Sequence, residues 1–464
     1  MHAQPVIAIF DVGKTNKKLV LFDENYKIIF ERSARFTETF DEDGDPCENL
    51  ESLRHSVFDS LHEVVQLKEY EIRAINFSTY GASFVYLGED GNPVAPLYNY
   101  LKEYPQELKK QFYKTYGGEE EFSYRTASPV LGSLNSGMQL YRIKYEKPEL
   151  FRRIKYALHL PQYFNFLFSG KALSDITSIG CHTNLWDFQK NEYHYWVKQE
   201  GILEKLAPLF PCDEVTGAIS QRNNYAVGVG LHDSSAALIP YLLNFREPFI
   251  LISTGTWCIS LNPFNNLPLT KKDLVNDCLC YMSYEGTPVK ASRLFAGHEH
   301  EQQVKVIADH FHQSVLKYRN MEFNPKIITE LHKKDKHLNN ENGNDIMLKK
   351  SLFEQRDMSS FATDEEAYHQ LILDIVKQQY ASTQLVLKGV PVKRIFVDGG
   401  FSKNFIYMNL LASFFTGKEI FAASMAQATA AGAALSIHKH WNKKPVPNDI
   451  IELKYYSFKL EEAL

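Results

Sequence analysis

The turn at positions 11–18 carries several groups that could hold a phosphorylated ligand. It follows an apolar run, and its candidate residues are Asp11, Gly13, Thr15, Asn16 and Lys18. The glycine would let backbone N–H groups approach an anion, while the threonine, asparagine and lysine would add donors and positive charge. The aspartate could hold a magnesium ion through water. The alternative is an ordinary hairpin with a polar turn, and the P-loop pattern GxxxxGK[ST] is absent.

A second turn in the middle of the sequence carries a similar set of groups. Residues 253–256 read Ser-Thr-Gly-Thr and separate two apolar runs. Thr254, Gly255 and Thr256 could therefore bind phosphate, although such a segment alone is more often a simple turn. Two turns of this kind, at the starts of two lobes, could face each other across a cleft. That arrangement would suit a polyphosphate with magnesium between the lobes.

One aspartate directly follows a short apolar run and precedes a helix-like segment. It is Asp233, in the stretch Gly230-Leu-His-Asp-Ser-Ser. An aspartate in this place is often a helix cap. The same place keeps the carboxylate ionised, because a helix N-terminus favours negative charge. An ionised carboxylate at a domain junction could accept the proton of a hydroxyl group while its oxygen attacks phosphorus.

A pair of glycines towards the C-terminus follows another apolar run. The stretch is Asp398-Gly-Gly-Phe-Ser-Lys-Asn404. Gly399 and Gly400 would leave room for a flat ring against the backbone, and Asn404 could hydrogen-bond that ring. A helix rich in alanine and glycine is expected at 427–440. It would allow close packing against this site, although close packing between helices would also explain its composition.

Alternating apolar strands and amphipathic helices predict an α/β protein. Strands are expected at 6–10, 19–22, 26–31, 72–77, 227–231, 249–252, 257–261 and 395–397, and helices at 53–67, from 233, at 364–387 and at 427–440. The first three strands should form an antiparallel meander. The strand–turn–strand unit from position 249 resembles the one at the N-terminus, which predicts two domains, 1–244 and 245–464. The polar stretch at 333–345 is expected to be an exposed loop.

Length and composition set further limits. A chain of 464 residues predicts two or three domains, and its 44% hydrophobic and 23% charged residues are ordinary for a globular protein. The net charge of -5 argues against nucleic acid as a partner. The six cysteines lack zinc-motif spacing, so we expect reduced thiols in a cytoplasmic protein. We expect no signal peptide and no membrane span, because no apolar run reaches about 18 residues.

Taken in order, the four motifs resemble those of the FGGY family of carbohydrate kinases, within the actin-like ATPase superfamily. Segments 11–18 and 253–257 resemble its two phosphate motifs, 230–236 is similar to the segment that holds its catalytic aspartate, and 398–404 resembles its adenosine motif. The resemblance covers essentially the whole chain. It implies two ribonuclease-H-like domains that flank a deep catalytic cleft, with ATP mainly on the C-terminal domain and the sugar mainly on the N-terminal one.

Within the family, the sequence is most similar to rhamnulokinases. Segment 78–85 resembles the stretch that lines their sugar pocket, and segment 160–170 also fits that subgroup. The resemblance implies substrate contacts at Thr79, Tyr80, Gly81, Ala82 and Asp233. Some positions depart from the rhamnulokinase pattern: Ser83 replaces a common aspartate, 98–102 replaces a stretch that usually ends in Asp and Arg, Asp398 replaces a third glycine, and Gln427 replaces a frequent glutamate. The first two departures leave the identity of the sugar open.

The resemblance implies an ATP-dependent sugar kinase that uses Mg²⁺ and phosphorylates a hydroxyl of a ketose or deoxyketose. Asp233 would accept the hydroxyl proton, and Asp11 would organise magnesium. ATP contacts are implied at Gly13, Thr15, Asn16, Lys18, Thr254, Gly255, Thr256, Gly399, Gly400 and Asn404. L-Rhamnulose is the first expected sugar, followed by L-fuculose and xylulose, and a homodimer is possible. The alternatives are a non-catalytic sugar or nucleotide sensor on the same scaffold and an actin- or chaperone-like ATPase.

Overall fold

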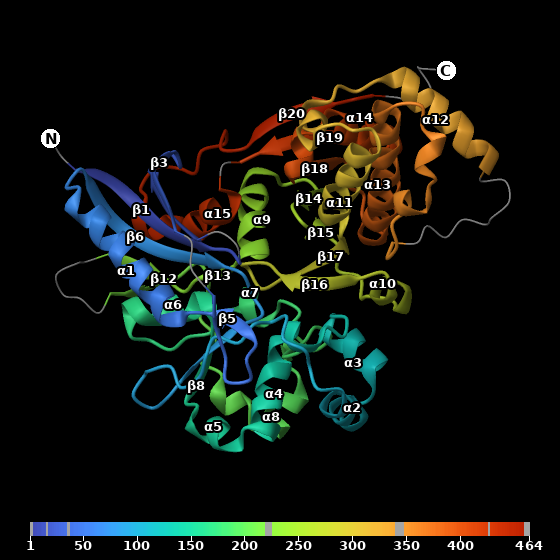
Figure 1. Ribbon diagram of the computed structural model, residues 1–464. Coiled ribbons are helices and arrows are strands. Elements are labelled where there is room, and N and C mark those ends of the chain that lie inside the picture. Colours follow the sequence, from blue (N-terminus) through green and yellow to red (C-terminus); the bar gives the residue numbers. More distant parts are fainter. Residues whose placement is uncertain are drawn as a thin grey trace.

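Two mixed β-sheets, one from each half of the chain, form the frame of the molecule (Figure 1). The computed structural model describes residues 3–14, 17–34, 38–218, 225–338, 348–425 and 427–458. In Figure 1 the first sheet lies on the left, the second at the upper right, and a group of helices below them. The predicted α/β class is confirmed.

The first sheet has the strand order β11-β12-β6-β1-β2-β3, and β13 also pairs with β6. Its strands are β1 (Gln4–Val12), β2 (Lys17–Asp23), β3 (Ile28–Ala34), β6 (Tyr70–Thr79), β11 (Val215–Gly217), β12 (Ala226–Gly228) and β13 (Leu231–His232). The first three form the predicted antiparallel meander, and β6 and β12 continue the sheet in parallel. Asp11 pairs with Ser78 in this register, so the end of β1 lies beside the segment predicted to contact the sugar.

The second sheet has the strand order β16-β17-β15-β14-β18-β19-β20. Its strands are β14 (Phe249–Thr254), β15 (Cys258–Asn262), β16 (Cys278–Met282), β17 (Pro288–Leu294), β18 (Arg394–Gly399), β19 (Glu419–Ser424) and β20 (Glu452–Tyr456). As in the first sheet, β14, β15 and β17 form an antiparallel meander, and β18 and β19 continue from β14 in parallel. Each lobe therefore has a ribonuclease-H-like core, and the two strand–turn–strand units occupy equivalent places.

Helices cover both sheets and build an additional layer in the first lobe. The longer helices are α1 (Leu50–Gln66), α2 (Gln106–Thr115), α4 (Ser136–Glu146), α6 (Leu160–Ser169), α9 (Asp233–Asn244), α11 (Ala296–His310), α12 (Pro325–Leu338), α13 (Asp364–Leu387), α14 (Phe405–Phe414) and α15 (Ala428–Ser436). The shorter ones are α3 (Glu119–Thr126), α5 (Pro148–Arg153), α7 (Ile176–Ile179), α8 (Tyr195–Gln199), α10 (Lys271–Val275) and α16 (His438–Trp441). The additional layer encloses an aromatic core in which Phe112 packs edge to face on Trp196. Short strands complete the lobe: β4 (Glu38–Phe40), β5 (Pro46–Glu48), β7 (Phe84–Leu87), β8 (Tyr156–His159), β9 (Trp186–Asp187) and β10 (Glu192–Tyr193).

Two helices, α9 and α15, lie side by side between the sheets (Figure 1). α15 comes from the C-terminal half of the chain, yet it also packs on β1 and β6 of the first sheet. Its alanines Ala430, Ala431, Ala433 and Ala434 are fully buried there. The close packing predicted for this small-residue helix is present, and its main partner is α9 rather than the glycine pair at 399–400. The division between residues 244 and 245 stays a prediction.

Three segments differ from the sequence-based expectation. The loop predicted at 333–345 is helical up to Leu338, because buried Ile328 and Leu331 anchor α12 to the core; residues 339–345 lie outside the described ones. The strand predicted at 227–231 is divided, since the chain turns between β12 and β13. The helix predicted at 427–440 is also divided, into α15 and α16.

Candidate functional site

Asp233 is the first residue of α9 and directly follows β13. His232 occupies the N-cap position, and no side chain caps the helix, so a capping role for Asp233 is not supported. One carboxylate oxygen accepts a hydrogen bond of 2.6 Å from the backbone N–H of Ser234. Burial raises the pKa of Asp233 to about 6, while hydrogen bonds from Ser234 oppose the rise. The carboxylate is therefore mostly ionised at neutral pH and basic enough to accept a proton.

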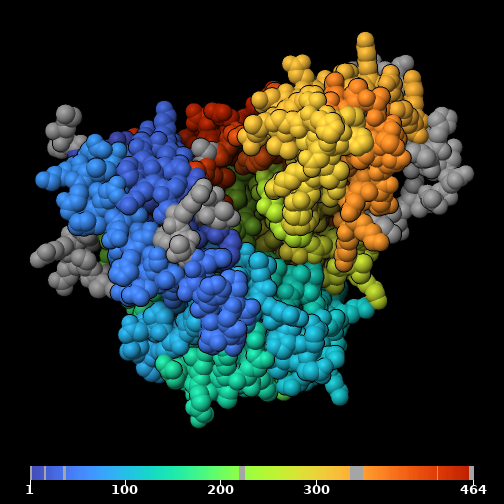
Figure 2. Space-filling view, in the orientation of Figure 1, coloured from blue at the N-terminus to red at the C-terminus, as the bar shows by residue number. Residues whose placement is uncertain are grey.

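The surface is hollowed between the two lobes, with green segments visible between the blue and the yellow ones (Figure 2). α9 is the green helix that joins the lobes in Figure 1. The Asp233 side chain is 33% exposed, so a ligand that enters between the lobes can reach the carboxylate.

Asp11, near the end of β1, lies close enough to Asp233 for the two charges to interact. Its Oδ2 accepts a hydrogen bond of 2.8 Å from the hydroxyl of Thr429 on α15, which is 418 positions away in the sequence. Burial raises the pKa of Asp11 to about 6, and the charge of Asp233 adds to the rise. The positive charge of Lys18 opposes it. Two carboxylates that repel each other at one place favour a cation between or beside them.

The second lobe contains a pocket of about 320 Å³. It is lined by Gly255, Gly297, His300, Arg319, Tyr368, Gly400, Phe401, Lys403 and Asn404. Three of the residues predicted to contact ATP, from two separate motifs, are thus brought to one cavity. No motif in the sequence indicated His300 of α11 or Tyr368 of α13, because each lies within a regular helix.

Thr254 ties together the two turns that border this pocket. Its hydroxyl donates a hydrogen bond of 2.6 Å to the carbonyl of Asp398 and accepts one of 3.0 Å from the N–H of Phe401. Gly399 lies against the same residue with a φ of +91°, and a Cβ there would be 2.0 Å from the Thr254 carbonyl oxygen. The Thr254 side chain is buried. It therefore holds the turns in place rather than facing a ligand.

Asn404 lines the pocket, but both of its side-chain polar atoms have protein partners. Its Oδ1 accepts a hydrogen bond of 2.9 Å from the N–H of Tyr407 and caps α14. Its Nδ2 donates one of 2.9 Å to the hydroxyl of Tyr368. We therefore expect Asn404 to shape the cavity wall through Tyr368 as much as to contact a ligand.

α9 connects Asp233 to the second-lobe pocket. The hydroxyl of Tyr241, on the same helix, donates a hydrogen bond of 3.0 Å to Oδ2 of Asp398, next to the glycine pair. This contact gives a reason for the aspartate where the family usually has a third glycine. The eight positions from Asp233 to Tyr241 span about 12 Å along a helix axis. An extended nucleoside triphosphate can cover that distance.

The segment predicted to contact the sugar lies beside Asp233, and its residues differ in accessibility. Thr79 is fully buried and its hydroxyl donates a hydrogen bond of 2.8 Å to the Tyr80 carbonyl, so its side chain is not free for a ligand. The backbone of Gly81 lies against His232, because a Cβ there would be 2.6 Å from the imidazole. Ala82 has a φ of +67°, and its carbonyl accepts a hydrogen bond of 2.6 Å from Gln139. The contacts with His232 and Gln139 hold the backbone of this segment in place.

Tyr80, which is buried, forms an aromatic pair with Tyr100, with ring centroids 5.8 Å apart. The ammonium of Lys14 lies 5.9 Å from the Tyr80 ring centroid and 5.7 Å from that of Tyr100. Burial raises the pKa of Tyr100, and the charges of Asp233 and Glu48 add to the rise. Tyr100 is therefore close to the candidate base, although sequence reasoning noted only that its segment departs from the rhamnulokinase pattern.

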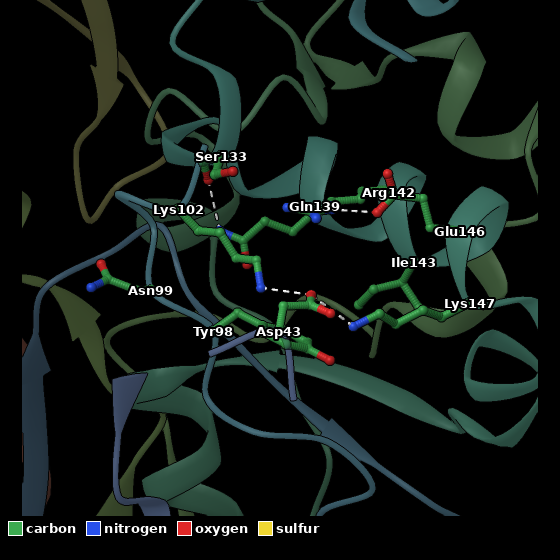
Figure 3. Close-up of a pocket in the computed structure, with 10 residues that line it drawn as sticks. All are labelled: Asp43, Tyr98, Asn99, Lys102, Ser133, Gln139, Arg142, Ile143, Glu146 and Lys147. Atoms are coloured by element: carbon green, nitrogen blue, oxygen red, sulfur yellow. Dashed lines mark hydrogen bonds and ion pairs between the residues drawn. The ribbon is translucent and has the colours of Figure 1, made fainter. Parts of the chain in front are cut away.

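The two sequence departures on the sugar side are in contact with each other. The Ser83 hydroxyl donates a hydrogen bond of 3.1 Å to the carbonyl of Tyr98. Lys102 forms ion pairs with Asp41 at 2.6 Å and with Asp43 at 2.8 Å, and Figure 3 shows the pair with Asp43. Lys147 also binds Asp43, at 3.1 Å. The small pocket at this place measures about 30 Å³, enough for water but not for a sugar.

The remaining predicted residues have varied positions. Gly13 lies between β1 and β2, and Lys18 pairs with Glu31 at 3.0 Å. Thr256 is exposed, and its carbonyl accepts a hydrogen bond of 3.2 Å from the N–H of His298. Thr15 and Asn16 lie outside the described residues. Thr429 is a site residue that the sequence did not indicate, because only the fold brings α15 to β1.

Each half of the chain forms a ribonuclease-H-like lobe, and models of a known protein family match both halves. The description "FGGY family of carbohydrate kinases, N-terminal domain" matches residues 6–239. "Carbohydrate kinase FGGY, C-terminal domain" matches residues 246–324, and "FGGY family of carbohydrate kinases, C-terminal domain" matches residues 351–437. The chain belongs to the FGGY family of carbohydrate kinases.

Relatives with known names are distant in sequence. A rhamnulokinase from Mannheimia succiniciproducens is 23% identical over 274 residues, which cover 54% of this chain and 52% of that protein. One from Halalkalibacterium halodurans is 24% identical over 188 residues, 38% of this chain and 39% of that protein. The matched segment thus spans about half, or less, of the length of these relatives.

Solved structures share the fold over the whole chain. A carbohydrate kinase from Novosphingobium aromaticivorans has a TM-score of 0.77 at 22% identity, with 98% of each chain covered. A xylulose kinase from Lactobacillus acidophilus has a TM-score of 0.79 at 16% identity, with 99% of this chain and 94% of the other covered. These neighbours confirm the predicted two-domain architecture. Among the described residues, no helix combines the length and apolar character that a membrane span requires.

Proposed function

We propose that this chain is an ATP-dependent carbohydrate kinase in which Asp233 is the catalytic base. The main support is the connection made by α9. The side chain of its first residue, Asp233, is only partly buried, at 33% exposed, and its Tyr241 hydrogen-bonds to Asp398 beside the second-lobe pocket. A nucleoside held at Gly400 would therefore extend its phosphates along α9 towards Asp233 and Asp11.

In the proposed reaction a sugar hydroxyl oxygen attacks the γ-phosphorus of ATP. A bond forms between these two atoms, the bond from that phosphorus to the β,γ-bridging oxygen breaks, and ADP leaves. The Asp233 carboxylate accepts the proton of the hydroxyl group. The buried position of the carboxylate, which raises its pKa to about 6, makes it a stronger base than an ordinary exposed aspartate. Closure of the lobes would exclude water from the same place.

The residues at the junction also fit a magnesium ion. Mg²⁺ usually keeps several waters and binds one or two carboxylates together with substrate phosphates. Asp11 offers such a carboxylate, which a hydrogen bond from Thr429 orients. Burial raises its pKa, and the nearby charge of Asp233 adds to the rise. When bound there, magnesium would neutralise charge on the phosphates.

For the acceptor we propose a ketose or deoxyketose, with L-rhamnulose first and L-fuculose and xylulose next. Tyr80, Tyr100 and Lys14, which contact one another close to Asp233, would form one wall of the sugar site. Ser83 carries no charge, and the charge of Lys102 is paired with Asp41. This wall therefore has fewer free charges than the rhamnulokinase pattern implies. A cytoplasmic location and a homodimer stay predictions.

A substrate screen tests the proposal directly. With ATP and magnesium, we expect at least one of these sugars to release ADP well above a sugar-free background in a coupled assay, with the phosphorylated sugar identified by mass spectrometry. No sugar-dependent ADP across a broad panel of ketoses and polyols would favour a sensor on the same scaffold. ADP release that does not depend on sugar would favour an actin- or chaperone-like ATPase.

Gly400→Leu should weaken nucleotide binding without lowering the stability of the fold. No atom of the described residues lies within 4 Å of a Cβ built at Gly400, so the larger side chain fills pocket space without a clash. We expect ATP affinity, measured by calorimetry, to fall at least about tenfold while the Tm stays within about a degree of wild type. Gly217→Leu, which also enters open space but lies in the other lobe, is the control. Unchanged ATP affinity in Gly400→Leu would place the nucleotide elsewhere.

A further inference from the structure

A cysteine and two histidines, which the proposed reaction does not use, meet directly behind Asp233. One potential ligand atom from each of Cys181, His182 and His232 lies within 4.8 Å of the others. The Sγ of Cys181 is 3.1 Å from Nε2 of His232. The same nitrogen is 3.3 Å from Oδ1 of Asp233, so a fourth possible ligand adjoins the group. The sequence gives no zinc-motif spacing, because His232 follows 50 positions after His182.

The three side chains are buried, and part of their hydrogen-bonding capacity is unused. Cys181, His182 and His232 are 0%, 8% and 4% exposed. Within the part of the chain that the structure describes, Nδ1 of His182 and Nδ1 of His232 are buried without a hydrogen-bond partner, and in His232 the other nitrogen, Nε2, faces Cys181 and Asp233. Buried polar atoms without partners are uncommon in proteins and call for an explanation. His182 also has a φ of +39°, an unfavourable backbone conformation of the kind that is concentrated at functional sites.

Both histidine rings are fixed in place by aromatic packing. His232 stacks on Tyr281 with ring centroids 5.7 Å apart, and His182 packs edge to face on the same ring at 6.1 Å. A site with rigid ligands loses little entropy when it takes up an ion.

We propose that Cys181, His182 and His232, together with the Asp233 carboxylate, form a site for a thiophilic divalent transition metal such as Zn²⁺. Cysteine sulfur, imidazole nitrogen and carboxylate oxygen are all ligands of this ion, which usually takes four of them in a tetrahedron. Binding replaces the proton of the Cys181 thiol with the metal, and the proton leaves to solvent. The complex of one M²⁺, one thiolate and one carboxylate is neutral, which a buried site tolerates better than a net charge.

Arg293 is the charge that would oppose a cation at this place, since it interacts with both Cys181 and His182. It is paired with Asp277, by bonds of 2.8 Å and 3.1 Å, and its guanidinium lies 5.1 Å from the Trp257 ring centroid. Its charge is therefore largely compensated within the protein. An ion can enter from the space between the lobes, because the Asp233 side chain is 33% exposed.

Occupancy would switch off catalysis, a consequence that rests on the proposed function. A carboxylate bound to a metal cannot accept the hydroxyl proton. Zn²⁺ at this site would therefore inhibit without competing with magnesium at Asp11 or with ATP in the second-lobe pocket. The binding claim itself does not depend on kinase activity, so the two can fail separately.

Cobalt substitution of the full-length, metal-free protein tests the site. We expect one Co²⁺ per chain, a thiolate-to-cobalt charge-transfer band in the near ultraviolet, tetrahedral d–d bands in the visible, and loss of all bands when Zn²⁺ is added. In Cys181→Ser the charge-transfer band should disappear and cobalt affinity should fall at least about tenfold. Cys280→Ser removes another buried cysteine outside the cluster and should keep the wild-type spectrum.

Two results would overturn the proposal. One is the absence of a charge-transfer band in the wild-type protein at stoichiometric cobalt, or an equal band in Cys181→Ser. The other requires no variant, in case the substitutions impair folding: X-ray absorption of the zinc complex must show one sulfur and otherwise nitrogen or oxygen ligands. As the functional readout, Zn²⁺ should inhibit wild type and Cys280→Ser but not Cys181→Ser, each relative to its own metal-free rate.

Discussion

Asp233→Asn is expected to lower kcat at least about a hundredfold while the affinities for ATP and sugar stay nearly unchanged. The amide has the shape of the carboxylate, and its oxygen can still accept the 2.6 Å hydrogen bond from the N–H of Ser234. It cannot accept the proton of the attacking hydroxyl. Rates from steady-state kinetics and affinities from calorimetry separate these effects, because a lost base changes kcat rather than binding.

The same variant should not lose stability at neutral pH. The folded-state pKa of Asp233 is raised, so the folded protein binds more protons than the unfolded chain between the ordinary aspartate pKa and about 6. The ionised group therefore opposes folding above that window, and the neutral amide removes the effect. We expect the Tm of Asp233→Asn at pH 8 to equal or exceed that of wild type. An inactive variant with normal stability would exclude unfolding as the cause of inactivity.

Asp213→Asn provides the matched control. Asp213 is a half-exposed aspartate whose carboxylate pairs with Lys439 at 2.9 Å. The same chemical change there should alter neither kcat nor binding. If Asp233→Asn retained near-normal turnover while a sugar was being phosphorylated, Asp233 would have no role as the base, and another group near Asp11 would have to be sought.

Local patterns in the sequence predicted local structure well. The helix at 364–387 has the predicted bounds, and the glycine-bearing strand–turn–strand units are present in both sheets. These features depend on side-chain periodicity and turn chemistry within a few residues. The placement of Asp233 at the start of a helix was predictable for the same reason. Its proximity to Asp11 was inferred only from the resemblance.

Contacts between distant segments could not be read from such patterns. Thr429 binds Asp11, Tyr241 binds Asp398, and Cys181 meets His232, yet none of these pairs has a sequence spacing that indicates contact. A helix of small residues predicts that another segment packs closely against it, but the pattern does not identify that segment. The polar residues after Leu331 likewise suggest a loop in the sequence. The sequence does not show that the apolar residues before them anchor α12 to the core. The junction of the lobes depends almost entirely on contacts of this long-range kind.

Gly432→Ala is expected to have the largest effect on stability, although helix propensity alone predicts the opposite sign. In an isolated helix alanine is favoured over glycine by about 1 kcal/mol. Here a Cβ at Gly432 would lie 1.8 Å from the carbonyl oxygen of Ala236 on α9. That carbonyl lacks its usual intrahelical donor, because the residue four positions later is Pro240, which has no N–H. The two helices therefore touch backbone to backbone, and no flexible side chain can move aside.

The clash should outweigh the gain in propensity. Overpacking typically costs about 1–3 kcal/mol, and a contact with rigid backbone belongs at the upper end of that range or beyond it. We expect the Tm of Gly432→Ala to fall by roughly 5 °C or more in calorimetry. Gly217→Ala, where a Cβ meets no atom within 4 Å, should leave the Tm unchanged. Because α9 begins at Asp233 and α15 carries Thr429, the helices that Gly432 brings together also hold the two carboxylates in place. A variant that folds should therefore also lose turnover, whereas an unchanged or higher Tm would show that α9 and α15 are not in contact at this point.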